Sequence, residues 1–148
     1  MNYSNKNMKS NFYLLTFLLI IFFTINGYAA ERKKYNFNSE WRLQVGDFPQ
    51  AKKPDFKDSS WKQVTLPHAF NEDEAFRISI EQHTDTVVWY RKHFRIEELR
   101  GKKVFVEFEG VRQGGEFFLN GQYLGLHENG VMAVGFDLTP YMKEGDNV

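Results

Sequence analysis

The Asn120-Gly121 dipeptide constrains the fold of this chain more than any other feature of its sequence. Both residues accept positive φ angles, which the two-residue turn of a β-hairpin requires. Apolar residues flank the dipeptide on both sides, at residues 117–119 and 123–124. The pattern predicts a hairpin at the centre of a longer strand-rich stretch, which covers residues 89–138.

Short segments in which apolar and polar residues alternate continue this pattern along the chain. Alternation with a period of two is typical of strands with one buried face. Turn signals separate the segments at intervals of about 8–12 residues, as in antiparallel sandwiches and barrels. The sequence therefore predicts an all-β fold, with strands at residues 41–45, 63–66, 87–96, 103–109, 116–119, 122–124 and 134–138.

Two single helical turns are the expected exceptions. Asp58 has a side chain that can cap a turn ending at Trp61. Thr139-Pro140 has the form of a helix start, with a hydroxyl cap followed by proline. Residues 144–147 are expected to form a tight turn, after which Val148 begins another strand.

The N-terminus has the three-part order of a secretory signal peptide. Lys6 and Lys9 precede a largely apolar run at residues 12–25, and small residues follow as far as Ala30. A membrane anchor is the alternative, but the run is shorter than the roughly 18–20 apolar residues that span a bilayer. We therefore expect no stable membrane span.

We expect signal peptidase to cleave after Ala29 or Ala30. Residues 1–29 are then a signal peptide, and residues 30–148 form one exported domain, periplasmic or secreted if the source is bacterial. A domain of this size buries roughly two-thirds of the surface that its unfolded chain exposes.

Charge and cysteine content exclude several classes of partner and site. Nineteen Lys and Arg residues balance nineteen Asp and Glu residues, so the formal net charge is zero. A nucleic-acid partner would need a clustered basic face, and the basic run at residues 32–34 is better explained as a solvated leader. We therefore expect no nucleic-acid partner. The absence of cysteine excludes disulfides and thiolate metal sites.

No residue pattern in the chain indicates catalysis. Glu107 and Glu109 lie two residues apart on an expected strand, near the separation of the two carboxylates in inverting glycosidases. Their alternation with Val106 and Phe108 instead favours the solvent face of a half-buried strand. No nucleophile elbow, phosphate-binding loop or dinucleotide motif is present, and the four histidines lack metal-ligand spacing. We expect no catalytic residue, no metal and no cofactor in this chain.

Residues 68–85 form the least regular part of the expected domain. Acidic and polar residues at positions 71–74 are followed by a segment without a clean period. Loops longer than about 12–15 residues are usually functional or disordered. The segment is therefore the first candidate for a ligand-facing loop, and a solvated connection is the equal alternative. We expect His68, directly after Pro67, to point inward and to be hydrogen-bonded.

Six short motifs in order along the chain resemble the N-terminal sugar-binding domain of glycoside hydrolase family 2, which contains β-galactosidases, β-glucuronidases and β-mannosidases. They are residues 61–68 (WKQVTLPH), 89–94 (WYRKHF), 108–111 (FEGV), 119–125 (LNGQYLG), 136–139 (FDLT) and 145–148 (GDNV). The loop after the hairpin departs from the family, because residues 129–131 are Asn-Gly-Val where Gly-Gly-Tyr is common. That departure indicates a divergent subgroup.

The resemblance implies a galactose-binding-like jelly-roll β-sandwich, placed at the start of a longer exported glycosidase. An immunoglobulin-like domain and a (β/α)8 barrel would follow, with two barrel glutamates as acid/base and nucleophile. Both glutamates would lie beyond Val148, so this chain alone is expected to be inactive. The resemblance also implies that loops of the domain border the cleft and contact carbohydrate, and the candidate residues are Asn71, Glu72, Asp73, Arg112, His127 and Glu128.

Two functions are open at this point. The first is the N-terminal domain of a secreted family 2 glycosidase, most like a β-galactosidase, which hydrolyses O-glycosidic bonds. The second is a stand-alone, non-catalytic sandwich that binds carbohydrate or another surface. We expect the domain to be incomplete at its C-terminus, because the strand that begins at Val148 would lack a ladder partner.

Overall fold

The computed structural model describes residue 13 and residues 32–71 and 86–148. The chain divides into two compact units, residues 1–35 and residues 36–148, and the second unit contains the fold. The expected signal peptide falls almost entirely outside the described residues and stays a prediction. Within the described part of the chain, no helix has the length and apolar character needed to cross a membrane.

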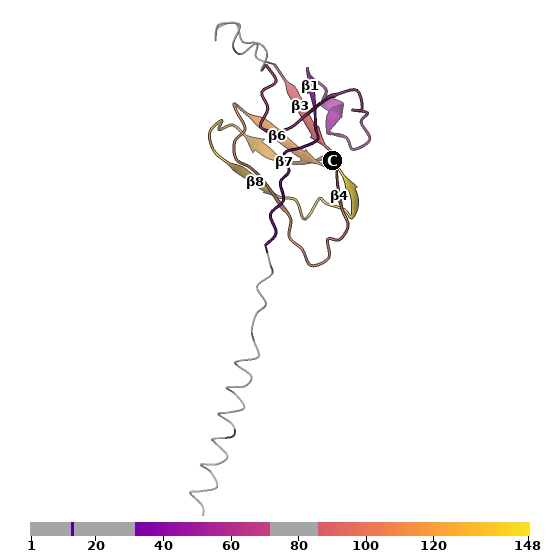
Figure 1. Cartoon of the computed structure of the whole chain (residues 1–148), viewed down its shortest axis with the longest axis vertical. Coiled ribbons are helices and arrows are strands. Elements are labelled where there is room, and N and C mark those ends of the chain that lie inside the picture. Colours follow the sequence, from indigo (N-terminus) through magenta and orange to yellow (C-terminus); the bar gives the residue numbers. More distant parts are fainter. Residues whose placement is uncertain (1–12, 14–31, 72–85) are drawn as a thin grey trace, which may run out of the picture. The chain divides into compact units, whose positions relative to one another are not determined.

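Strands dominate the second unit, as the alternating sequence predicts (Figure 1). One 3₁₀ helix, η1 (Pro49–Lys52), follows the first strand. The described strands are β1 (Trp41–Val45), β2 (Lys62–Val64), β3 (Val88–Lys92), β4 (Phe94–Ile96), β5 (Phe105–Phe108), β6 (Gly115–Leu119), β7 (Gln122–His127), β8 (Val134–Asp137) and β9 (Gly145–Asn147).

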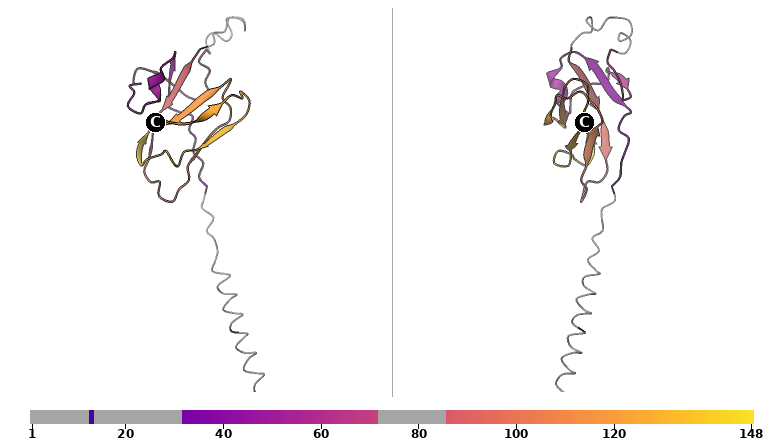
Figure 2. Two further views of the ribbon diagram at one scale, coloured as in Figure 1. Left: turned by 180° about the vertical axis from the view of Figure 1, so that it is seen from behind. Right: turned by 90° about the vertical axis from the view of Figure 1, so that its left-hand side faces the viewer.

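The described strand pairs of this unit are all antiparallel. The central strand β1 pairs with β2 on one side and with β3 on the other, while β4 pairs with β9, β5 with β8 and β6 with β7. Figure 2 shows these pairs from behind and from the side, with the C-terminal end of the chain beside the turn of the β6–β7 hairpin. Segments distant in sequence therefore meet at the end of this hairpin.

The core lies between the sheet β2-β1-β3 and the pair β5–β8. Trp41, Leu43 and Val64 are buried at its centre, with Val88 and Tyr90 packed against them. The Trp41 ring lies 6.2 Å from that of Phe108 on β5, which joins the two layers. Further ring contacts run from Phe108 to Phe117 at 5.1 Å and from Phe117 to Phe136 at 4.8 Å. These ring contacts extend the core from β5 to β6 and β8.

The predicted hairpin is confirmed at Asn120-Gly121. Both residues have positive φ angles, 52° and 85°, as the two-residue turn requires. The ladder of β6 and β7 shifts register between Phe117 and Phe118, which pair with Gly125 and Tyr123, so the extra residue of the bulge is Leu124 of β7, shortly after the turn.

The single strand predicted at residues 87–96 is wrong in one respect, because it divides at His93. β3 pairs with β1, whereas β4 pairs with β9. The side chain of His93 turns away to bind Asp58, with 2.7 Å between Nε2 and Oδ2. The chain therefore passes from one sheet to another at this residue, as strands do at sandwich corners.

Predictions near the C-terminus also need correction. The Thr139 hydroxyl accepts a hydrogen bond from the Val104 N–H at 2.9 Å instead of capping a helix. A single helical turn is present near the expected position, since the N–H groups of Tyr141 and Met142 both donate to the Leu138 carbonyl. Residues 145–147, expected in a tight turn, are strand β9, so the last strand starts before Val148 and has a ladder partner in β4.

Candidate functional site

The Leu-Pro-His segment anchors the start of the candidate loop to strand β3. Leu66 and Pro67 are joined by a cis peptide bond. The His68 Nδ1 atom lies 3.1 Å from the Tyr90 hydroxyl, which also donates to the His68 carbonyl at 3.4 Å. Burial raises the pKa of Tyr90, so its hydroxyl stays protonated at neutral pH. The expectation of an inward-pointing, hydrogen-bonded His68 is confirmed.

Asn71 follows this anchor by three residues and is half-buried. Glu72 and Asp73 lie outside the described residues. The anchor shows where the segment leaves the core, beside Tyr90 of β3. The assignment of Asn71, Glu72 and Asp73 to sugar binding stays a prediction.

Arg112, His127 and Glu128 come together at the open end of the β6–β7 hairpin. His127 is paired with Gly115 at the last position of the ladder. The turn before β6 lies against the loop after β7, because a Cβ on Gly114 would stand 3.4 Å from the His127 carbonyl and 3.9 Å from Glu128 Cα. This end of the hairpin carries half of the predicted site residues.

The backbone at this end of the hairpin is tightly packed. A Cβ on Gly130 would stand 2.9 Å from the Gln113 nitrogen and 3.5 Å from Arg112 Cα. Gln113 has a φ of 67°, in the left-handed region that non-glycine residues seldom adopt. The close crossing holds Arg112 and the 127–130 loop in a defined relation. The resemblance to the family selected Arg112, His127 and Glu128. The close approach of the two backbone segments has no local signal in the sequence other than Gly114 and Gly130.

The side chains at the open end suit the binding of a polar ligand. Arg112 and Glu128 are exposed, and His127 is half-buried with its Nε2 atom buried and unpaired among the described residues. A guanidinium donates to hydroxyl oxygens and a carboxylate accepts from hydroxyl groups, which together match the edges of a sugar ring. No group of three His, Asp or Glu side chains within the described ranges is arranged to hold a metal ion.

The Glu107 and Glu109 pair lies on the solvent side of β5. Both residues are exposed, whereas Val106 and Phe108 between them are half-buried. Glu107 is paired with Gly135 of β8, so no carboxylate faces it across the ladder. The interpretation of this pair as a solvent face is confirmed.

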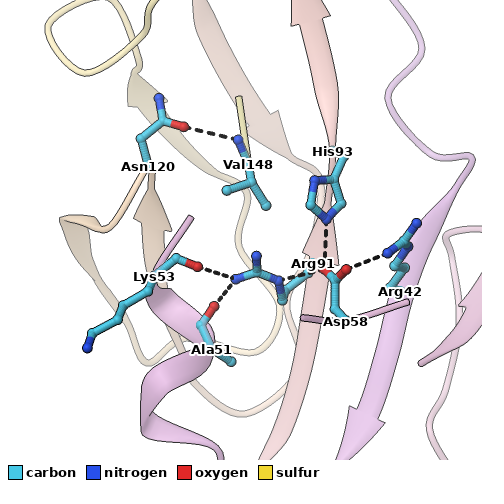
Figure 3. A network of polar contacts seen from close by, with 8 residues as sticks. All are labelled: Arg42, Ala51, Lys53, Asp58, Arg91, His93, Asn120 and Val148. Carbon is cyan, nitrogen blue, oxygen red and sulfur yellow. Dashed lines mark hydrogen bonds and ion pairs between the residues drawn. The ribbon is translucent and has the colours of Figure 1, made fainter. Parts of the chain in front are cut away.

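An ionic cluster around the buried Asp58, which sequence analysis missed, joins the 47–61 loop to the sheet. Asp58 is 3% exposed and accepts hydrogen bonds from Arg42 of β1, from Arg91 Nε of β3 at 2.8 Å and from His93 at 2.7 Å (Figure 3). The Arg91 guanidinium also donates through Nη1 to the carbonyls of Ala51 and Lys53. We call Arg42, Asp58, Arg91 and His93 the Asp58 cluster.

The electrostatics of the Asp58 cluster favour its ionised form. Burial by itself would raise the pKa of Asp58, but hydrogen bonds from Arg91 and His93 and their positive charge outweigh this effect and lower the pKa from 3.8 to about 2. The carboxylate is therefore fully charged at neutral pH. With every oxygen engaged by the protein's own donors, the cluster fastens the loop and offers no free group for chemistry.

Comparison with known proteins assigns this fold to a family. The family model described as "Glycosyl hydrolases family 2, sugar binding domain" matches residues 37–148. This chain belongs to glycosyl hydrolase family 2. The match covers both β3 with its WYRK sequence and the Asn120-Gly121 hairpin, so the resemblance in the sequence is confirmed.

Relatives within family 2 are much longer than this chain. A β-glucuronidase of Formosa agariphila is 39% identical over 126 residues, which cover 80% of this chain but 13% of the relative. A β-galactosidase of Bacteroides ovatus is 37% identical over 124 residues, covering 78% of this chain and 14% of the relative. The chain thus spans about one-seventh of the relatives that it matches.

Solved family 2 structures share the all-β sandwich. A β-glucuronidase structure superposes with a TM-score of 0.70 at 35% identity, over 80% of this chain and 14% of the other. A β-glycosidase from Bacteroides vulgatus gives a TM-score of 0.68 at 34% identity, over 78% of this chain and 16% of the other. The predicted jelly-roll sandwich is therefore confirmed, and the chain is similar to the sugar-binding domain of these glycosidases.

Proposed function

We propose that this domain is the N-terminal part of a longer family 2 glycosidase that hydrolyses β-glucuronides or β-galactosides. The observation that supports this most strongly is the family match over residues 37–148, together with 39% identity to a β-glucuronidase. The relatives named above carry the names of hydrolases, and none of them supports a stand-alone binding module. The described residues include polar groups suited to ligand contacts and no catalytic constellation, so we assign the proposed chemistry to a part of the polypeptide outside this chain.

The domain's role in this proposal is to border the sugar-binding cleft. Its contribution is the open end of the β6–β7 hairpin, with Arg112, His127 and Glu128, and the segment that starts at Asn71. The tight crossing at Gly130 supports this role, because contact residues bind best when the backbone that carries them is held in place. An immunoglobulin-like domain and a barrel with two catalytic glutamates are the expected partners in the same polypeptide.

The proposed function is tested by extending the reading frame and assaying its product. The full-length polypeptide is expected to hydrolyse p-nitrophenyl β-glucuronide or β-galactoside with retention of configuration. The 148-residue chain is expected to hydrolyse neither. A stop codon directly after Val148, or a long product inactive on both substrates, would overturn the glycosidase proposal.

Export is a separate part of the proposal. The order of basic, apolar and small residues at positions 1–30 supports a cleaved signal peptide. Mass spectrometry of the purified product is expected to show an N-terminus at Ala30 or Glu31. A substitution Leu19→Arg in the apolar run is expected to keep the full-length precursor in the cytoplasm, whereas Leu19→Ile preserves export. An uncleaved, cytoplasmic wild-type product would overturn this part.

A further inference from the structure

Two exposed apolar side chains stand at the open end of the β6–β7 hairpin, beside the polar candidate residues. Val131 is 89% exposed, the largest exposed fraction among the large apolar side chains of the described residues, and Met132 is 58% exposed. Both lie in the loop that joins β7 to β8, directly after Gly130. We call Val131 and Met132 the apolar tip. A single exposed apolar residue is normal on a protein surface, but two neighbours beside a candidate binding site indicate an apolar contact.

The backbone holds the apolar tip in place. The Asn129 side chain accepts a hydrogen bond from the Val131 N–H at 3.2 Å, which closes a turn at the tip. Gly130, the residue before Val131, lies so close to the Gln113 nitrogen and to Arg112 Cα that a Cβ would stand 2.9 and 3.5 Å from them. The two apolar side chains are therefore presented outward by a fixed backbone, and they are available to a ligand.

The apolar tip lies close to Arg112 and Glu128. Gly130 joins the tip to the crossing with Arg112, and Glu128 is three residues before Val131. One end of the hairpin thus presents a cation, a carboxylate and two apolar side chains. A ligand that matches all of them has hydroxyl groups on one part and an apolar group on another. A glycoside with an aryl or alkyl aglycone has this form, whereas an oligosaccharide carries hydroxyl groups throughout.

We propose that the apolar tip contacts the aglycone of the substrate and gives the glycosidase a preference for glycosides with an apolar aglycone. This inference rests on the proposed function, because it places the open end of the hairpin at the sugar-binding cleft. Met132 suits the role, since an unbranched thioether side chain adapts to apolar groups of different shapes. Neither Val131 nor Met132 can supply a proton or a strong hydrogen bond, so both act on the binding of the aglycone and not on the chemical step.

The two ends of the hairpin have different neighbours. At the turn, the Asn120 N–H donates to the Val148 carbonyl at 2.8 Å, and in Figure 1 the C-terminal end of the chain lies at this turn. Strand β7, with six residues, separates the turn from the open end by about 20 Å. A polypeptide that continues beyond Val148 therefore starts at the opposite end of the hairpin from the apolar tip. A neighbouring domain that folds over the tip is the alternative occupant, and the test distinguishes it from an aglycone.

The test replaces the apolar tip by polar side chains of similar size. Val131→Thr and Met132→Gln are combined in one variant of the full-length glycosidase proposed above. Phe105→Gln is the matched control, because Phe105 is 65% exposed at the end of β5 away from Arg112. The inhibitors are the phenyl and the methyl 1-thio-β-glycosides of the preferred sugar. Because they are not hydrolysed, their inhibition constants report aglycone binding without the effect of leaving-group reactivity.

The proposal predicts a loss that depends on the aglycone. The double variant is expected to raise the inhibition constant of the phenyl thioglycoside about 5- to 10-fold and to leave that of the methyl thioglycoside unchanged. Phe105→Gln is expected to change neither constant. No change for the phenyl compound, or an equal change for both compounds, would overturn the proposal. A lower Tm of the double variant with unchanged constants would also overturn it, since a neighbouring domain would then cover the tip.

A second measurement needs no glycosidase activity. The chain has four methionines, and Met1 and Met8 lie in the expected signal peptide. In the 148-residue chain labelled with ¹³C at the methionine methyl groups, the Met132 resonance is assigned by its loss in Met132→Gln, and the half-buried Met142 is the internal control. Millimolar phenyl thioglycoside is expected to shift the Met132 resonance and not that of Met142, while the methyl thioglycoside shifts neither.

The two measurements separate the aglycone contact from the proposed function. An unchanged Met132 resonance, or equal shifts with both thioglycosides, would overturn the aglycone contact whatever the activity of the longer polypeptide. A full-length product that hydrolyses neither β-glucuronides nor β-galactosides would overturn the proposed function, and a Met132 shift specific to the phenyl compound would then still support the contact.

Discussion

Asp58 and Arg91 form a buried ion pair, with 2.8 Å between Oδ2 and Nε and with both side chains about 95% buried. The pair joins a loop residue to a strand residue 33 positions later in the sequence. Since the same guanidinium also binds the carbonyls of Ala51 and Lys53, one contact fastens the whole η1 region to β3.

Removal of the Asp58 charge is expected to cost stability. Asp58→Asn leaves the buried Arg91 charge without a counter-charge, and breaking such a pair costs about 3–5 kcal/mol. Urea unfolding, followed by tryptophan fluorescence, measures the loss. The control is Asp146→Asn, because Asp146 is 86% exposed in its pair with Arg95, and exposed pairs contribute about 0–1 kcal/mol. Equal losses in the two variants would contradict a structural role for the Asp58 cluster.

Acid is expected to weaken the fold through Asp58. Its pKa is about 2 in the folded protein and near 3.8 when unfolded, so its contribution is fully present above pH 4 and is lost as the pH falls toward 2. The difference corresponds to about 2 kcal/mol. Unfolding free energies measured from pH 6 to pH 2 are expected to show this slope in the wild type and a shallower one in Asp58→Asn. Identical slopes would show that other carboxylates cause the acid sensitivity.

The Asn120 side chain is expected to stabilise the C-terminal strand. It donates to the Tyr141 carbonyl at 2.9 Å and to Asn147 Oδ1 at 2.8 Å, and it accepts from the Val148 N–H. Asn120→Gly keeps the positive φ but removes these bonds, for an expected loss of about 1–3 kcal/mol. Hydrogen exchange is expected to accelerate at residues 145–148 and not in β1. Unchanged protection there would contradict the proposed anchoring.

Gly130 is expected to tolerate no side chain. A Cβ would stand 2.9 Å from the Gln113 nitrogen, so Gly130→Ala must displace backbone atoms, at an expected cost of about 1–3 kcal/mol. Gly110→Ala is the control, because nothing lies within 4 Å of its Cβ position. Chemical denaturation of both variants measures the difference. A Gly130→Ala variant as stable as Gly110→Ala would show that the backbone around Gly130 can shift without loss of unfolding free energy.

Loss of the proposed sugar contacts at the open end of the hairpin is expected to raise KM. In the full-length glycosidase proposed above, Arg112→Ala and Glu128→Ala remove groups that we propose to bind substrate, and each is expected to raise KM about 5- to 20-fold with a smaller change in kcat. Steady-state kinetics on the preferred p-nitrophenyl glycoside measures both constants. Glu107→Ala on the solvent side of β5 is the control and is expected to change neither. An effect of Glu107→Ala equal to that of Glu128→Ala would remove the assignment.

Local patterns predicted those parts of the fold that depend on neighbouring residues. Trp41 and Leu43 are buried at alternating positions of β1, and Asn120-Gly121 forms the turn, because period and turn chemistry are properties of a few consecutive residues. Thr139 shows the limit of this argument. The local sequence predicts that its hydroxyl caps a helix. In the structure this hydroxyl instead accepts a hydrogen bond from the N–H of Val104, 35 positions away in the sequence.

The sequence by itself determined most of the strands, the hairpin and the family of this domain. Only the tertiary structure decided that β3 ends before His93, that Asp58 is buried against Arg91, and that Arg112, His127 and Glu128 lie together. The reason is that the partner of a charged side chain can lie in a segment far away in the sequence. Whether Asp58 faces water or Arg91 depends on where the 47–61 loop packs, and that follows from contacts between segments far apart in the chain.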